Sequence, residues 1–65
     1  MKNYIAVHKK ENYSKVLLNI RWIETVTAHE ISGSWIHLYR TIDVCVKESV
    51  DEIEKLIAKA EQQSQ

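Results

Sequence analysis

A metal site in this 65-residue chain would need ligands brought together from His8, His29, Glu30, His37 and Cys45. Their spacing argues against a metal site, because none of them belongs to a close pair of the C-x-x-C or H-x-x-x-H kind. His37 and Cys45 can share one face of a sheet, but a flat sheet surface provides neither an oxyanion hole nor a pocket. We therefore expect no catalytic residue, no cofactor and no metal, and thus no enzyme.

A stripe of aromatic side chains is the stronger signal. In residues 34–40, SWIHLYR, rings occupy every second position. Successive side chains of a β-strand point to opposite faces, so Ile36 and Leu38 share one face. The opposite face carries Trp35, His37 and Tyr39. A small sheet needs only one apolar face for its core, so this second face is the best indication of function.

Composition limits the function classes. Nine Lys and Arg residues balance nine Asp and Glu residues, which argues against a protein devoted to binding phosphates. The lone cysteine, Cys45, fits a reducing cytoplasm, and the N-terminal residues show neither a signal peptide nor a membrane span. A chain this short buries only about 60% of its unfolded surface, so we expect help from oligomerisation.

The pattern of apolar residues predicts one α+β domain over residues 1–65. We predict a small five-stranded, mainly antiparallel sheet with one C-terminal helix packed on its aliphatic face. Asn19 is expected to cap a short helical turn at residues 20–22, and Ser49 with Glu52 forms a capping box that opens the helix. The predicted strands cover residues 4–8, 15–19, 23–28, 34–39 and 42–47, and the predicted helix covers residues 50–62.

The turn between the last two strands determines which residues face each other. A two-residue loop would mix the apolar and polar faces, whereas a three-residue loop pairs Leu38 with Ile42 and Ile36 with Val44. We adopt the three-residue loop because it gathers the aliphatic side chains in one core. It also places His37 opposite Asp43 and Trp35 opposite Cys45. Its third position, Thr41, would then need a positive φ, which glycine prefers.

Three interpretations of the aromatic stripe remain open. The first is a protein interface, since Trp and Tyr are enriched where proteins meet. The second is a surface covered within the chain by Trp22 and the N-terminal hairpin. The third is a stacking platform for single-stranded nucleic acid. The predicted interface comprises Trp22, Trp35, His37, Tyr39 and Cys45. The nucleic-acid alternative uses Lys9, Lys10, Lys15, Trp35 and Tyr39.

Several short motifs occur in an order that resembles the FlbD-like family of small flagellar and swarming-motility proteins. They are Leu18-Asn19, Ile23-Glu24, Ile36-His37-Leu38 and Val46-Lys47-Glu48-Ser49-Val50 with Asp51-Glu52. The resemblance covers roughly residues 15–58 and implies a cytoplasmic accessory protein without catalytic residues. A weaker similarity of arrangement links the chain to LytTR-type DNA-binding domains. We expect a non-enzymatic protein-interaction module that self-associates, with a small nucleic-acid-binding module as the alternative.

Overall fold

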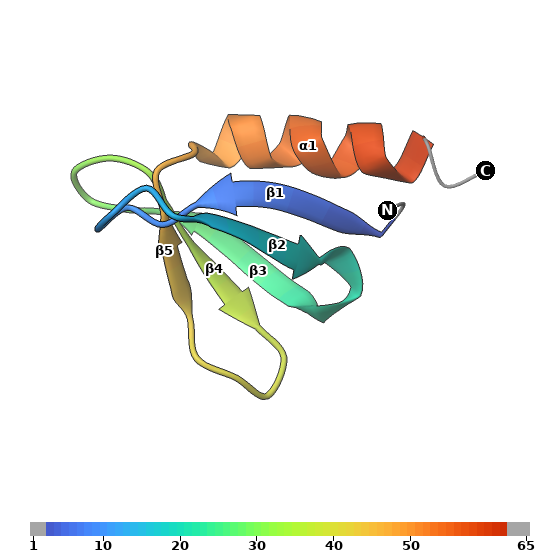
Figure 1. The fold of residues 1–65 in the computed structure, drawn as a ribbon, viewed down its shortest axis with the longest axis horizontal. Helices are drawn as coiled ribbons and strands as arrows, with labels where there is room; N and C mark the ends of the chain where they lie inside the picture. The colour runs from blue at the N-terminus through green and yellow to red at the C-terminus, as the bar shows by residue number, and fades with distance from the viewer. Residues whose placement is uncertain (1–2, 63–65) are drawn as a thin grey trace.

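The computed structural model describes residues 3–62, which form five strands, a 3₁₀ turn and one helix (Figure 1). The predicted helix and the first three predicted strands have the observed bounds. The elements are β1 (Tyr4–His8), β2 (Lys15–Asn19), η1 (Ile20–Trp22), β3 (Ile23–Ala28), β4 (Ser34–Leu38), β5 (Val44–Val46) and α1 (Val50–Gln62).

The strands form two sheets, so the prediction of one five-stranded sheet is wrong. β1 and β2 make an antiparallel hairpin, and β3, β4 and β5 make a three-stranded antiparallel sheet with β4 in the centre. An isolated bridge between Lys9, which follows β1, and Val46 of β5 joins the two sheets. Backbone bonds from Lys10 N to Cys45 O (3.1 Å) and from Lys47 N to His8 O (2.9 Å) flank that bridge. The α+β class, the antiparallel pairing and the C-terminal helix are as predicted.

The register between β4 and β5 follows the aliphatic face. Ile36 pairs with Val44, and Trp35 pairs with Cys45, as predicted. Both strands are shorter than expected, because β4 ends at Leu38 and β5 begins at Val44.

Ile42 therefore lies in the connection and is 80% exposed, so its predicted place in the core is wrong. Arg40, rather than Thr41, has the positive φ of 58° that lets the chain turn.

The core lies between the two sheets and the helix. Helix α1 runs along β1 (Figure 1). Its fully buried Ile53 belongs to one core cluster with Val7 of β1 and Ile36 of β4. The apolar residues of α1 form one stripe along the helix because positions three and four apart share one side. The buried apolar residues are Ile5, Val7, Leu18, Ile36, Val46, Ile53 and Ala60.

Local hydrogen bonds set the ends of the helical segments. The Asn19 side chain accepts from the amide of Arg21 (3.0 Å), which confirms the predicted cap of η1. The Ser49 hydroxyl accepts from the amide of Glu52 (3.2 Å), and the Glu52 carboxylate accepts from the amide of Ser49 (3.1 Å). This reciprocal pair is the predicted capping box.

No helix within residues 3–62 is long and apolar enough to cross a membrane.

Gly33 allows the backbone before β4 to approach the end of β5. Its φ is +80°, a conformation that L side chains rarely adopt. A Cβ atom at this position would also collide with the carbonyl oxygen of Val46. The chain's only glycine therefore stands where both the φ angle and the available space require it.

Candidate functional site

The outer surface of the three-stranded sheet carries the aromatic residues singled out in the sequence. We call Trp22, Trp35, His37, Tyr39 and Cys45 the aromatic face. Trp35 and His37 come from β4, and Cys45 lies opposite Trp35 on β5. Tyr39 follows β4, and its ring centroid lies 6.2 Å from that of Trp22. Trp22, Trp35 and Tyr39 are 50%, 38% and 46% exposed, so contacts within the chain cover them only in part.

A polar chain of three side chains crosses the aromatic face. The Nδ1 atom of His37 lies 2.9 Å from Oδ2 of Asp43, as the predicted register requires. The Nε2 atom of His37 lies 3.3 Å from the hydroxyl of Thr27. Carboxylate, imidazole and hydroxyl thus stand in the order used by serine hydrolases. Backbone amides of a strand lie in the plane of the sheet, so those beside Thr27 do not converge above its face to form an oxyanion hole.

A hollow of about 500 Å³ opens beside Trp35. Its size falls within the roughly 300–1,000 Å³ range of ligand pockets. The N-terminal hairpin forms one wall and the β4–β5 connection forms another. The lining residues are Lys9, Lys10, Glu11, His29, Trp35, Ile42, Asp43, Val44 and Cys45.

Lys10 ties the walls of the hollow together. Its backbone amide donates to the carbonyl of Cys45, and its ammonium donates to the carbonyl of Ser32 (2.9 Å). The same ammonium lies 3.3 Å from Nδ1 of His29, which also accepts from the amide of Ile31 (3.1 Å). Two donors at Nδ1 favour the tautomer with the proton on Nε2. The His29 ring stacks on Trp35 at 5.8 Å between centroids. These contacts hold the His29 side of the hollow in a defined position.

The residues of the nucleic-acid alternative are only partly brought together. Lys9, Lys10 and Trp35 line the hollow. Lys15 lies at the start of β2, paired with His8, and is not part of the lining. Tyr39 is beside Trp22, also outside the lining.

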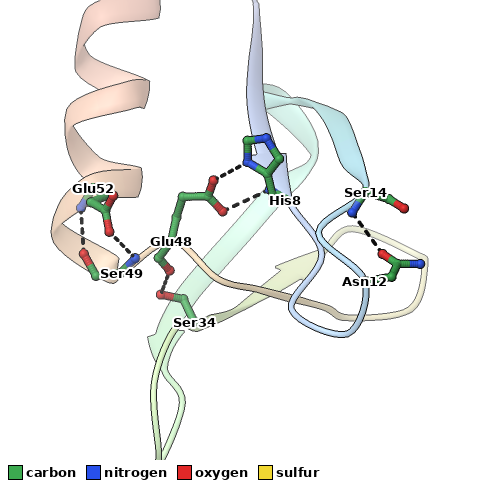
Figure 2. A network of polar contacts seen from close by, with 7 residues as sticks. All are labelled: His8, Asn12, Ser14, Ser34, Glu48, Ser49 and Glu52. Carbon is green, nitrogen blue, oxygen red and sulfur yellow. Dashed lines mark hydrogen bonds and ion pairs between the residues drawn. The ribbon is translucent and has the colours of Figure 1, made fainter.

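A second polar site was not predicted from the sequence. The carboxylate of Glu48 accepts from the amide of His8 (3.0 Å) and lies 2.7 Å from its Nδ1 atom (Figure 2). The backbone carbonyl of Glu48 accepts from the buried hydroxyl of Ser34 (2.8 Å). We call His8, Ser34 and Glu48 the junction, because they join β1, β4 and the segment before α1. His8 and Glu48 are 40 residues apart, and no local pattern announces such a pair.

Burial and hydrogen bonding act in opposite directions on Glu48. Desolvation of its carboxylate raises the pKa, while the side-chain and backbone hydrogen bonds from His8 lower it. The hydrogen bonds prevail, and the pKa of Glu48 is held below its usual value. The junction therefore stabilises the ionised carboxylate.

The five candidate ligands of the sequence are dispersed. His8 belongs to the junction, His37 pairs with Asp43, and His29 stacks on Trp35. Within residues 3–62 no three His, Cys, Asp or Glu side chains are grouped in a way that could hold a metal ion.

No protein-family model matches the chain, and comparisons with curated proteins and with solved structures returned no match. The aromatic face and the hollow are therefore the basis for a functional proposal.

Proposed function

We propose that the chain is a non-enzymatic protein-interaction module that self-associates through the aromatic face. The observation that carries this proposal is the set of large, half-exposed rings beside an open hollow. They lie on the sheet face opposite the core of residues 3–62. Trp and Tyr are the side chains that most often dominate binding energy at interfaces.

Size supports the same proposal. The chain exposes 4823 Å² in total. A standard interface buries about 800 Å² of each partner, which is about a sixth of this surface. A second copy that covers the aromatic face and the hollow would also remove from water apolar surface that a short chain cannot bury by itself.

Sedimentation equilibrium of the wild type and of Trp35→Ala tests the proposal. We expect the wild type to form an oligomer and Trp35→Ala to weaken it by at least about tenfold, since hot-spot aromatic residues contribute about 2 kcal/mol or more. Tyr4→Ala is the matched control, because Tyr4 on β1 is 39% exposed and Trp35 is 38% exposed. A wild type that stays monomeric at high concentration would contradict the proposal.

Nucleic-acid binding is the second candidate, favoured by the position of Lys9 and Lys10 beside Trp35 in the hollow. Cationic side chains next to a stacking ring suit single strands. Titration of labelled single strands at low and moderate salt tests it, since such binding weakens with salt. The absence of binding at low salt would remove this candidate.

We propose a cytoplasmic, motility-accessory role only as an extension of the resemblance to the FlbD-like family. It is supported by the four sequence motifs quoted above. Loss of swarming after deletion of the gene, with recovery by the wild-type gene but not by Trp35→Ala, is the expected result.

A further inference from the structure

The loop between β3 and β4 carries the most exposed large apolar side chain of the described residues, Ile31, at 86% exposure. The same loop borders the hollow through His29. We propose that two copies of the chain associate about a two-fold axis, with Ile31 of each copy inserted into the hollow of the other. This inference rests on the proposed function and specifies its partner, a second copy, and its contacts.

The loop holds Ile31 in a defined position. The amide of Ile31 donates to Nδ1 of His29, and the amide of His29 donates to the carbonyl of Gly33 (3.0 Å). Lys10 holds the carbonyl of Ser32 from the side of the hollow. An apolar side chain presented by an ordered loop loses little conformational entropy on binding.

The hollow suits an aliphatic side chain. Trp35, Ile42, Val44 and Cys45 give it apolar walls, and its volume of about 500 Å³ exceeds that of one isoleucine side chain. Ile42 is itself 80% exposed, so an inserted Ile31 would cover it. One contact would then bury the two most exposed aliphatic side chains of residues 3–62.

Charge complementarity points to the same partner. Glu30 precedes Ile31 on the loop, and Lys9 lines the hollow. Neither side chain has an ion-pair partner among residues 3–62. The hollow also carries Lys10 and two carboxylates, Glu11 and Asp43, of which Asp43 is paired with His37. Insertion of Ile31 into the hollow of a second copy brings Glu30 of one copy toward Lys9 of the other.

Symmetry limits the assembly to a dimer. The loop and the hollow lie next to each other, since His29 belongs to the loop and lines the hollow. The β3–β4 loop and the β1–β2 turn also project from the same end of the molecule (Figure 1). A patch that contains both halves of the contact can meet its own copy reciprocally, and such an interface closes at two subunits.

The first experiment removes the inserted side chain. We expect Ile31→Ser to raise the dimer dissociation constant by at least about 100-fold, because each of the two copies loses a buried aliphatic group. Leu17→Ser is the matched control, since Leu17 on β2 is exposed and lies outside the hollow. Both constants come from sedimentation equilibrium, with circular dichroism to confirm folding.

The second experiment tests the charge pair by mixing. Glu30→Lys and Lys9→Glu should each weaken self-association by about tenfold, since each places like charges together twice in a symmetric dimer. An equimolar mixture should form a heterodimer, because both contacts then join a lysine to a glutamate. One variant is labelled with ¹⁵N, because exchanging Glu for Lys hardly changes the mass of the chain. Native mass spectrometry then distinguishes the heterodimer from the two homodimers by mass.

The outcomes separate this inference from the proposed function. A dimer that persists in Ile31→Ser and disappears in Trp35→Ala overturns the inference and leaves the proposed function standing. A monomeric wild type overturns both. A mixture of Glu30→Lys and Lys9→Glu that forms no heterodimer overturns the charge pairing.

Discussion

Two histidine–carboxylate pairs within residues 3–62 have similar lengths and different surroundings. His8 and Glu48 in the junction approach to 2.7 Å, and His37 and Asp43 on the aromatic face approach to 2.9 Å. The Glu48 side chain is only 10% exposed, whereas that of Asp43 is 47% exposed. Glu48 also accepts a bond from the amide of His8. Burial and this additional bond make the first pair part of the fold.

Strand β4 connects the two regions through its alternating faces. Ser34 and Ile36 are fully buried, and in the junction the Ser34 hydroxyl donates to the backbone carbonyl of Glu48. Trp35 and His37 point to the other side, where solvent reaches them. Substitutions on the first side should therefore change stability, and substitutions on the second should change association while leaving the monomer folded.

Gly33→Ala should have the largest effect and lies on the junction side. The positive φ alone costs a non-glycine residue about 1–3 kcal/mol, and the collision with the Val46 carbonyl adds to this. Urea unfolding measures the loss of stability. Ser32→Ala, a change at an exposed neighbour, should stay within about 0.5 kcal/mol of the wild type. Equal stability of Gly33→Ala and Ser32→Ala would contradict the close approach.

Glu48→Gln should have the next largest effect, about 1.5–3 kcal/mol at pH 7, because it removes a charged hydrogen-bond acceptor. Because the pKa of Glu48 is lowered in the folded chain, the unfolded chain binds a proton at Glu48 at a higher pH than the folded chain does. The contribution of Glu48 is therefore complete above about pH 4.5 and is lost as the pH falls through the lowered pKa.

Urea unfolding at a series of pH values checks this prediction. The difference in stability between the wild type and Glu48→Gln should shrink on acidification below about pH 4.5. A difference that stays constant down to about pH 3 would show that the junction does not stabilise the ionised carboxylate.

Asp43→Asn should have the smallest effect, below about 1 kcal/mol, because solvent screens an exposed pair. The same urea measurement at pH 7 compares it directly with Glu48→Gln. A loss as large as that of Glu48→Gln would remove the distinction between the two regions.

The local elements of the fold were predictable because their signals are local. A run rich in β-branched residues indicated β3, and the capping box of Ser49 and Glu52 indicated the start of α1. The β4–β5 register followed from keeping Ile36 and Val44 on one aliphatic face. Each of these features depends on residues close together in the chain or directly across one turn.

The exposure of Ile42 was missed because the connection between β4 and β5 is longer than predicted. The other features that were missed depend on distant segments. The division into two sheets arises because the end of β1 meets β5 at a single short contact around Lys9 and Val46, which are 37 positions apart. The pairing of His8 with Glu48 and the approach of Gly33 to Val46 also bring together residues from separate segments of the chain. For the candidate site, the sequence indicated the aromatic face, while the hollow required the N-terminal hairpin to be placed beside Trp35.

The bridge between Lys9 and Val46 also gives the molecule a natural pair of reporters. The amides of Lys10 and Lys47 bond across it, from one sheet to the segment of the other. Their hydrogen exchange with solvent therefore reports separation of the two sheets, whereas ladder amides report opening within one sheet. Lys10 lies on the rim of the hollow and Lys47 does not. If a second copy covers the hollow, raising the protein concentration should slow exchange at Lys10 and leave exchange at Lys47 unchanged. A general tightening of the fold would slow exchange at both amides.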